Sequence, residues 1–479
     1  MSPSVEPFNE AKYKALMDGL KCKEVLYHDA SANKDFRIDS QFYTANILHN
    51  DDLQYEPIGN FLISSQYGVS KDMNTDGIGY PIYRMNEIHH SLCDISTDKY
   101  VKLESTEFAN VELKDGDVLF NRTNSFDFVG RTGVYYYCGI PQTFASYLVR
   151  FVPDNTNIYS EYLAAFLNTQ YGIQEIRRRA RQSINQTNVN PEEVKAINIP
   201  LLKKSIQEQI RKCYIQAHLL RVKAAKLYDE TETFLKTALG FDDVEIESDS
   251  ITTKTFSESF TVSARLDAEY YQPKYEQYEK ALKTTETVSS LCNIFDKNYL
   301  PEDMESYQYI ELANVGVSGE ISDVETQIGK NLPTRARRKV KSGQVIVSSI
   351  EGSLKSCALI TDEYDGALCS TGFYVVNSDY INSETLLVLF QSEPIQALLK
   401  QRCSGTILTG ISKDEFLSLP LPKVDEDIQK EIAAKVQESF ALRKQSKQLL
   451  EYAKQAVEMA IEQDEDKALE WLKSKGVEG

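Results

Sequence analysis

The eight residues FRIDSQFY (Phe36–Tyr43) are written almost unchanged a second time, as ARLDAEYY (Ala264–Tyr271), 228 positions later. After the first residue, both read Arg, aliphatic, Asp, small, Gln or Glu, aromatic and Tyr. Other matches follow in the same order. YPIYRMNEI from Tyr80 and YQYIELANV from Tyr307 are 227 positions apart, as are LKDGDVLFNRT from Leu113 and VKSGQVIVSSI from Val340. INIPLLKKSIQEQI from Ile197 matches LSLPLPKVDEDIQKEI from Leu417, and in their helical part Ile206 and Ile428 are 222 positions apart. Ordered matches at a nearly constant offset indicate a duplicated unit of roughly 225 residues.

Each copy of the repeat begins with a strand-rich part. Short β-branched and aromatic runs, punctuated by Gly, Asn, Asp and Ser, predict strands in residues 116–123, 133–137 and 147–152, and again in 343–350, 357–361 and 372–376. The shared pattern Lys-x-Gly-x-Val predicts a turn glycine that leads into a strand. Helical segments at 160–180 and 383–402 follow these runs.

Each copy then ends in a long helix, predicted to start near Ser205 and near Asp425, after prolines that stop the preceding strand. In the first helix a 4-3-4-3 spacing joins Ile206, Ile210, Cys213, Ala217, Leu220, Ala224, Leu227, Thr231, Phe234 and Ala238. In the second helix the same register joins Ile428, Ile432, Leu442, Leu449, Ala453, Ala456 and Ala460, and Lys435, Ser439 and Ser446 weaken it. This spacing is typical of a coiled coil, so we expect the two helices to pair with each other over roughly 45–50 Å.

The totals narrow the class of protein. A chain of 479 residues is longer than the chains that usually fold around a single hydrophobic core, so two or three domains are expected. The sequence has no run of 18 apolar residues and no apolar core of a signal peptide at its N-terminus, and its eight cysteines are scattered without a C-x-x-C pair. We therefore expect a soluble, cytoplasmic protein without a disulfide framework. The only histidine cluster, His89-His90, is too small to predict a metal site.

No catalytic signature stands out. The sequence lacks the phosphate-binding loop G-x-x-x-x-G-K-[ST], the zinc motif H-E-x-x-H, the nucleophile motif G-x-S-x-G and the Asn-Pro-Pro-aromatic motif of amino-methyltransferases. Together with the duplicated frame, these absences favour a binding protein over an enzyme.

Positive charge is concentrated in two segments, although the chain as a whole carries a net charge of −18. RRRARQSINQTN (177–188) holds four arginines followed by amides and hydroxyls, and KNLPTRARRKVK (330–341) holds six Lys and Arg, both without an acid. Guanidinium groups suit phosphates, and amides and hydroxyls can reach base edges. The candidate DNA-binding residues in and around these segments are Arg84, Asn121, Arg122, Asn124, Arg131, Arg177, Arg178, Arg179, Arg181, Gln182, Ser183, Asn185, Gln186, Lys330, Arg335, Arg337, Arg338, Lys339, Ser349, Lys355, Arg402 and Thr406.

The pattern resembles the specificity subunits of type I restriction–modification systems. The paired RIDSQFY and RLDAEYY carry the resemblance, with YIELANVGVSGEI (309–321) and GTILTGISKDEFLSLPLPKVDEDIQKEI (405–432). The equivalent of the last stretch in the first copy, RQSINQTNVNPEEVKAINIPLL from Arg181, lacks the glycine-rich start and the second proline.

The resemblance implies an α+β fold: two similar β-rich target-recognition domains joined by two long antiparallel coiled-coil helices, with an internal pseudo-twofold repeat. The expected boundaries are 1–200 for the first recognition domain, 201–240 for the first spacer helix, 241–422 for an acidic connector and the second recognition domain, 423–465 for the second spacer helix, and 466–479 for an acidic tail that frays unless Trp471 anchors it. Helix pairing is assigned to Ile206, Ile210, Leu220, Leu227, Phe234, Ile428, Ile432, Leu442 and Leu449.

The function implied is non-catalytic recognition of double-stranded DNA, one domain for each half of an asymmetric, two-part site. The partners implied are two modification methyltransferase subunits and, in some systems, nuclease subunits; these would carry S-adenosylmethionine, ATP with Mg²⁺ and the catalytic residues. The ten Lys and Arg of the two basic segments would suffice for the six to ten phosphate contacts typical of a small footprint, about one cation per phosphate. Two alternatives stay open: the recognition subunit of a related system that cuts close to its site, and an acidic scaffold or decoy that mimics DNA.

Overall fold

The computed structural model describes residues 8–32, 37–45, 50–184, 186–241, 251–260, 265–322, 324–405 and 409–476. The chain divides into two compact units: residues 1–221 with 444–479 form unit 1, and residues 222–443 form unit 2. Unit 1 is therefore discontinuous in sequence, and each of the two long helices has one end in each unit.

Unit 1 is built around a six-stranded sheet in the order β2-β12-β8-β10-β6-β5, whose strands are β2 (Leu62–Tyr67), β12 (Leu148–Pro153), β8 (Val118–Asn121), β10 (Thr132–Val134), β6 (Leu92–Cys93) and β5 (Ile88–His89). A second sheet, β11-β4-β7-β3, contains β11 (Thr143–Phe144), β4 (Tyr80–Tyr83), β7 (Tyr100–Val101) and β3 (Met73–Asn74). β1 (Tyr55–Pro57) pairs with β15 (Asn198–Pro200). The helices of the unit that precede the long helix are α1 (Glu10–Met17), α2 (Tyr27–Ala32), α3 (Ser40–Thr44), α4 (Ser105–Val111), α5 (Ser160–Leu167), α6 (Gln170–Arg179) and α7 (Pro191–Lys195).

Unit 2 repeats the central part of this layout. Its first sheet, β16-β23-β20-β21, consists of β16 (Cys292–Ile294), β23 (Phe373–Ser378), β20 (Val345–Ser348) and β21 (Cys357–Leu359), which corresponds to β2-β12-β8-β10. Its second sheet, β18-β17-β22-β19, consists of β18 (Glu325–Ile328), β17 (Ser306–Ile310), β22 (Leu368–Ser370) and β19 (Ala336–Lys339). The helices of the unit outside the long pair are α10 (Pro273–Leu282), α11 (Val288–Leu291), α12 (Ser383–Gln391), α13 (Glu393–Arg402) and α14 (Lys413–Leu417).

The repeat read from the sequence is confirmed down to single hydrogen-bonded pairs. The parallel pair Thr143 and Ile82 in unit 1 corresponds to the parallel pair Leu368 and Tyr309 in unit 2. The predicted turn glycines also agree, since Gly116 and Gly343 both adopt left-handed backbone conformations, with φ of 83° and 81°. A residue with a side chain is strained in that conformation, which accounts for the same Lys-x-Gly-x-Val pattern in both copies.

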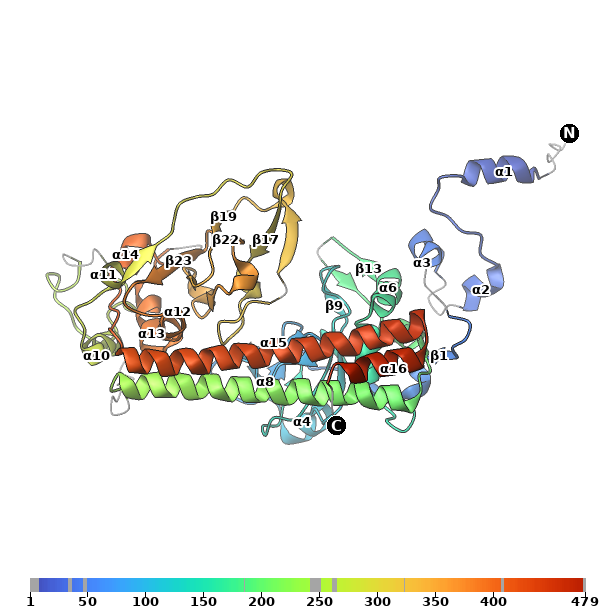
Figure 1. Ribbon diagram of the computed structural model, residues 1–479, viewed down its shortest axis with the longest axis horizontal. Helices are drawn as coiled ribbons and strands as arrows, with labels where there is room; N and C mark the ends of the chain where they lie inside the picture. The colour runs from blue at the N-terminus through green and yellow to red at the C-terminus, as the bar shows by residue number, and fades with distance from the viewer. Residues whose placement is uncertain are drawn as a thin grey trace. The chain divides into compact units, whose positions relative to one another are not determined.

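The two long helices are α8 (Lys204–Ala238) and α15 (Glu426–Glu462), and they lie side by side in opposite directions (Figure 1). In unit 1, the Ser446 hydroxyl of α15 donates to the Ala217 carbonyl of α8 at 2.8 Å. In unit 2, the Ser439 hydroxyl donates to the Ala224 carbonyl at 2.9 Å. The fold class expected from the sequence, two β-rich domains joined by antiparallel long helices, is therefore confirmed.

The two serines correct one detail of the predicted seam. Ser439 and Ser446 were expected to weaken it, but both are fully buried and hydrogen-bonded across it. Of the residues assigned to pairing, Ile206, Ile210, Ile432 and Leu442 are buried, whereas Leu220, Leu227, Phe234, Ile428 and Leu449 are half-buried. Toward the C-terminal end of α8, Thr231 is buried as predicted, but Tyr228 and Leu235 are buried in place of the predicted Leu227 and Phe234.

The C-terminal residues form α16 (Glu465–Ser474), and the prediction that this tail frays is wrong for that helix. Ala468 and Leu472 are buried in the core of unit 1, and Trp471 packs edge-on against Tyr452 with the ring centroids 5.7 Å apart. An apolar face on an otherwise acidic segment is enough to dock the helix. Most of the acidic connector lies outside the described residues.

Candidate nucleic-acid interface

In unit 1 the structure joins two segments that the sequence had nominated separately. Residues 181–188 form a hairpin of β13 (Arg181–Gln182) and β14 (Thr187–Asn188), and β14 also pairs with β9 (Thr123–Asn124). Pairing is reinforced at the next residue, where the Val189 amide donates to the Arg122 carbonyl at 2.9 Å. We call residues 180–190 reading loop 1.

The tip of reading loop 1 is unusual for a surface turn. The Ser183 amide and hydroxyl both donate to the Gln186 carbonyl, at 2.8 and 3.0 Å, and this closes the turn. Ile184 at the tip is 100% exposed, and Gln182, Ser183 and Gln186 beside it are exposed as well. The loop thus presents one aliphatic side chain among amides and a hydroxyl, the groups that can contact a thymine methyl and base edges. Asn185 lies outside the described residues.

Arginines stacked on aromatic rings lie beside the base of the hairpin. Arg177 lies over Phe126 at 5.3 Å from the ring centroid, Arg131 over Phe128 at 4.2 Å and Arg122 over Tyr67 at 5.1 Å. The only acid that pairs with Arg177 among the described residues is Asp127, at 3.9 Å, and both side chains are largely exposed. Stacking of this kind orients a guanidinium group. The Nε atom of Arg122 also donates to the Ser146 carbonyl at 3.1 Å.

Unit 2 builds the equivalent loop in the same way. The Ile411 amide donates to the Ser349 carbonyl at 2.8 Å, the counterpart of the contact from Val189 to Arg122. A second bond, from the Glu351 amide to the Thr409 carbonyl at 3.0 Å, ties the loop to the turn after β20. We call residues 403–412 reading loop 2; its residue Thr406 lies outside the described residues.

The second basic segment follows an edge strand. β19 carries Arg337, Arg338 and Lys339 at the edge of its sheet, where it pairs only with β22. Arg335 just before it is largely exposed and lies 3.3 Å from Glu311, and Lys339 lies over the ring of Tyr299 at 4.8 Å. Lys330 and Lys355 are exposed and Ser349 is half-buried. Arg338 is half-buried, with its Nε and Nη1 atoms making no hydrogen bond.

Three of the nominated residues are buried, which argues against their reaching DNA. Asn121 is fully buried; its amide group donates to the Phe128 carbonyl at 3.3 Å and accepts from the Thr123 amide. Arg179 and Arg402, the last residues of α6 and α13, are 6% and 8% exposed. Burial lowers the pKa of Arg179 to about 10, a change that nearby Glu193 opposes. Little of either guanidinium is left at the surface for a phosphate.

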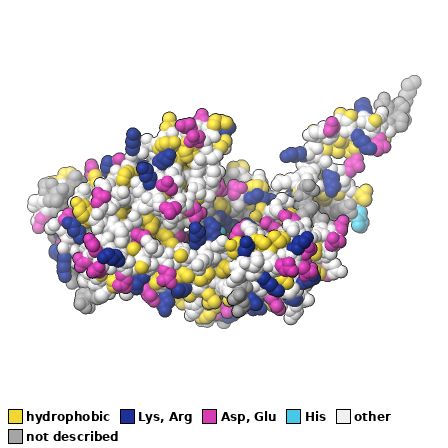
Figure 2. All heavy atoms as spheres, in the orientation of Figure 1, with side chains coloured by type: hydrophobic (Ala, Val, Ile, Leu, Met, Phe, Trp, Pro, Cys, Tyr) yellow, Lys and Arg dark blue, Asp and Glu magenta, His cyan; other side chains and the backbone are white. Residues whose placement is uncertain are grey.

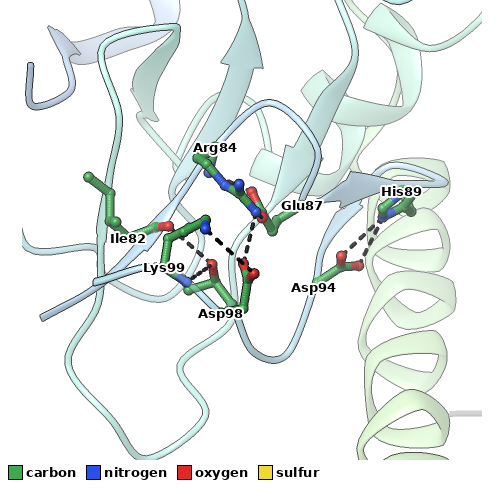
Figure 3. A network of polar contacts seen from close by, with 8 residues as sticks. Ile82, Arg84, Glu87, His89, Asp94, Asp98 and Lys99 are labelled. Carbon is green, nitrogen blue, oxygen red and sulfur yellow. Dashed lines mark hydrogen bonds and ion pairs between the residues drawn. The ribbon is translucent and has the colours of Figure 1, made fainter. Parts of the chain in front are cut away.

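Arg178 and Arg84 are held in ion pairs within the protein. Arg178 binds both oxygens of Glu175, at 2.9 and 3.1 Å, and burial is the main cause that lowers its pKa. Arg84 binds Glu87 and, at 2.9 Å, Asp98, as Figure 3 shows. The same view shows His89 and Asp94, 3.1 Å apart, beside α8. Arg84 belongs to this network of ion pairs. It follows β4, whereas reading loop 1 contains β13 and β14, which belong to another sheet.

Sequence reasoning missed two arginines that fix each β-rich domain to its long helix. Arg221 of α8 donates to the His89 carbonyl at 2.9 Å and lies 3.8 Å from Asp94. Arg443 of α15, 222 positions later, donates to Glu320 at 2.9 Å and to the Ser318 hydroxyl at 2.7 Å. The signal was present, because Leu-Arg recurs at 220–221 and 442–443, but the sequence does not show what either arginine binds.

No three His, Cys, Asp or Glu side chains among the described residues gather in a way that could hold a metal ion. All eight cysteines are free thiols. Burial raises the pKa of the Cys213, Cys357 and Cys369 thiols to about 12, so these thiols stay protonated and unreactive near neutral pH. None of the described helices is long and apolar enough to cross a membrane.

Comparison with known proteins shows which proteins this chain is similar to. Residues 42–213, which include most of the first β-rich domain and the start of α8, match the family described as the type I restriction modification DNA specificity domain. The putative type I restriction enzyme MjaX specificity subunit of Methanocaldococcus jannaschii is 22% identical over 416 residues, 85% of this chain and 92% of that protein. The EcoKI specificity subunit of Escherichia coli K12 is 32% identical over 83 residues, 17% of each chain.

The type I restriction enzyme StySPI specificity subunit of Salmonella potsdam is 26% identical over 153 residues, 31% of this chain and 33% of that protein. The match to the archaeal subunit spans both copies of the repeat, in agreement with the duplicated sheets and the long helices described above. Residues 42–213 thus match the DNA specificity domain of type I restriction modification, and most of the chain is similar to a putative type I specificity subunit.

Proposed function

We propose that this chain is the non-catalytic subunit that reads double-stranded DNA in a type I restriction–modification complex. Each unit reads one half of an asymmetric, two-part site. The observation that carries the proposal is a common frame with unlike surfaces: the two units share strand order, turn glycines and loop anchors, but their reading loops and basic segments differ in sequence.

Base contacts are assigned to the reading loops and phosphate contacts to the arginines around them. In unit 1, Gln182, Ser183 and Gln186 offer donors and acceptors on an anchored hairpin, and Arg177 lies beside it. Phosphate contacts position a protein on the duplex, whereas contacts to base edges carry the sequence preference. A two-stranded β-ribbon can enter the major groove.

The net charge of −18 is compatible with this role if the acids lie away from the reading surfaces. On the face shown in Figure 2, acidic and basic side chains are interspersed rather than gathered into one large acidic field. A decoy that mimics DNA would need such a field, since it replaces rows of phosphates. The mixed charge on this face therefore favours the DNA reader.

Chemistry is assigned to partner subunits. Two methyltransferase subunits would bring S-adenosylmethionine, and nuclease subunits, where present, would bring ATP and Mg²⁺. On α8, Ile215 and Leu219 lie one turn apart and are 38% and 59% exposed, and such an apolar pair on a spacer helix suits a helix of a methyltransferase subunit. A complex that modifies chromosomal DNA would work in the cytoplasm.

The test is to express the chain with its partner methyltransferase in a host that lacks other modification, and to sequence the methylated sites. The expected result is one two-part motif with an unspecified spacer. A variant in which residues 182–186 are replaced by Gly-Ser-Gly-Ser-Gly should lose the preference in one block and keep the other block. Methylation without any sequence preference in the wild-type complex would contradict the proposal.

A further inference from the structure

The most buried arginine of the basic segment closes reading loop 1 instead of facing solvent. Arg179 ends α6, directly before the loop, and Glu193 lies in α7, directly after it. The Arg179 Nε atom lies 3.8 Å from the Glu193 carboxylate, and the two side chains are 6% and 8% exposed. Arg179 also donates to the side chain and the backbone carbonyl of Glu175, one turn back in α6. The guanidinium is therefore hydrogen-bonded to the helix that enters the loop and forms an ion pair, without a hydrogen bond from Nε, with the helix that leaves it.

Unit 2 has the same connection at the same positions. Arg402 ends α13, and Glu415 is the third residue of α14, as Glu193 is of α7. The Arg402 Nε atom lies 4.0 Å from Glu415, and its Nη1 donates to the Leu398 carbonyl at 3.3 Å, the counterpart of the bond from Arg179 to Glu175. The pair is looser than in unit 1, because the side chain of Glu415 is 39% exposed. Arg402 also donates a hydrogen bond to the carboxylate of Glu279 in α10, at 2.8 Å.

The duplicated motif that opened the sequence supports the same helix end in both units. Within the motif, Arg37 donates to Asp39 at 2.7 Å and the Tyr43 hydroxyl to the Arg37 carbonyl at 3.0 Å. In the second copy, Arg265 and Asp267 lie 2.8 Å apart, and the Tyr271 hydroxyl donates to the Arg265 carbonyl at 3.0 Å.

The motif then docks on the last turn of the helix before the loop. In unit 1, Arg178 donates to the Phe42 carbonyl at 3.3 Å, and Arg179 lies over the Phe42 ring. In unit 2, Gln401 donates to the Tyr270 carbonyl at 3.0 Å, and Arg265 donates to the Cys403 carbonyl at 3.0 Å. Carbonyls at a helix C-terminus lack partners within the helix. The motif supplies them: Gln41 donates to the Arg177 carbonyl at 3.5 Å and Arg265 to the Cys403 carbonyl, which fixes the direction in which the chain leaves each helix.

We propose that Arg179 and Arg402 are positioning residues for DNA recognition: each closes one reading loop through the glutamate that follows it and fixes the specificity of one half of the site, independently of the other half. This inference rests on the proposed function. Neither arginine needs to touch DNA, because fixing the two ends of a loop limits the positions that its side chains can take.

The test measures methylation of a randomised two-part duplex library by the assembled complex with its methyltransferase, for Arg179→Gln and for Arg402→Gln. Arg179→Gln should lower the discrimination among bases in one block at least tenfold and leave the other block unchanged. Arg402→Gln should relax the other block, by a smaller factor, since its pair is longer and more exposed. The swap Arg179→Glu with Glu193→Arg should restore part of the lost discrimination.

If Arg179→Gln fails to fold, Glu193→Gln tests the same ion pair and should also lower the discrimination in one block. It leaves Arg179 bound to Glu175. Glu192→Gln is the matched control: Glu192 is the neighbouring acid of α7 and pairs with Lys195 on the surface. This control should keep both blocks. Circular dichroism checks that each variant is folded.

Retained discrimination in both blocks of folded Arg179→Gln and Glu193→Gln would overturn the inference. Equal loss in both blocks would overturn it too, since the effect would then be global. A uniform loss of affinity across all sequences, with a smaller salt dependence and no rescue by the swap, would mean that Arg179 binds a phosphate directly. A wild-type complex without sequence preference would instead overturn the proposed function itself.

Discussion

Three consecutive arginines, Arg177, Arg178 and Arg179, do three different things in one helix. Arg177 lies at the surface over Phe126, Arg178 pairs with Glu175 and docks on the duplicated motif, and Arg179 is buried at the base of reading loop 1. Successive residues of a helix point about 100° apart, so neighbours in sequence face solvent, a neighbouring segment and the core in turn. A basic run is therefore weak evidence about any one of its residues.

The buried serines of the helix pair give a prediction at the same scale. Ser439 and Ser446 are fully buried and donate to carbonyls of α8, which requires the helices to approach closely there. Replacing Ser446 by Leu should destabilise the chain by about 1–3 kcal/mol, because the extra volume forces the helices apart. Ser446→Ala should cost about 1 kcal/mol, the value of one hydrogen bond. Urea unfolding followed by circular dichroism measures both.

Lys447→Leu is the control for these substitutions, since Lys447 is the exposed neighbour of Ser446 on α15. Its effect on the free energy of unfolding should stay within about 0.5 kcal/mol. If Ser446→Leu were equally mild, the close approach of the helices at Ala217 would be wrong.

At the scale of elements, each long helix serves both as half of a pair and as the support of a β-rich domain. The helices α8 and α15 pair through small or buried residues, and beside these residues Arg221 and Arg443 bind the β-rich domains. The targets differ: a carbonyl and Asp94 between β5 and β7 in unit 1, and Ser318 with Glu320 in the turn after β17 in unit 2. The two copies of the repeat thus share the arginine on the long helix but differ in the groups that the arginine binds.

Removing an anchor should loosen one domain and not the other. Arg221→Ala should destabilise unit 1 by about 1.5–3 kcal/mol, the usual value of hydrogen bonds to a charged group, and Arg443→Ala should do the same in unit 2. Hydrogen exchange should then rise at residues 88–94 in the first variant and at residues 316–321 in the second. Lys223→Ala is the control, because its ion pair with Glu438 is exposed on both sides and should be worth less than about 1 kcal/mol. Equal changes in both segments for either variant would contradict separate anchoring.

At the scale of the whole molecule, the C-terminal residues 444–479 pack with residues 1–221 in unit 1. The core of unit 1 includes Leu450, Ala453, Val457 and Ile461 of α15 and Leu472 of α16, packed with Ile206, Ile210 and Ala217 of α8. Asn50 of the first domain also donates to the Ile461 carbonyl at 2.9 Å. Residues of α15 and α16 therefore complete the hydrophobic core of unit 1.

Truncation tests this dependence. A chain ending at residue 443 should lose cooperative unfolding of unit 1 and aggregate, because it exposes the apolar face of α8 that α15 and α16 cover. Adding residues 444–479 as a separate peptide should restore the thermal transition. A truncated chain that melts as sharply as the full chain would show that the C-terminal segment is dispensable for unit 1.

Helix length provides a second test at this scale, and it rests on the proposed function. Inserting seven residues after Ala224 adds about 10 Å of helix and keeps the heptad register. The spacer between the two recognised blocks should then lengthen, by about three base pairs if the gain is fully transmitted, while both blocks stay the same. Sequencing of methylated sites measures the spacer. Altered blocks with the original spacer would count against helices that set the distance.

Much of the architecture could be predicted from sequence, for a physical reason. Strand periodicity, turn glycines, prolines at helix starts and the 4-3 spacing are local, and a duplication doubles each signal, so the order of elements and the helix pair followed from the residues alone. Seam details such as Ser439 and Leu235 did not follow, because small polar residues are buried or exposed according to the partner that faces them.

The site was predicted less well than the fold. Composition identified the segment 177–188 and, within residues 120–135, Asn121, Arg122, Asn124 and Arg131, but only strand pairing between β9 and β14 joined the two into one surface. The roles of Arg179 and Arg402 depend on Glu193 and Glu415, which follow after a loop of variable sequence. The sequence by itself determined the duplicated frame; the tertiary structure alone decided which charges face solvent, because burial and ion pairing are set by residues that are distant along the chain and adjacent in space.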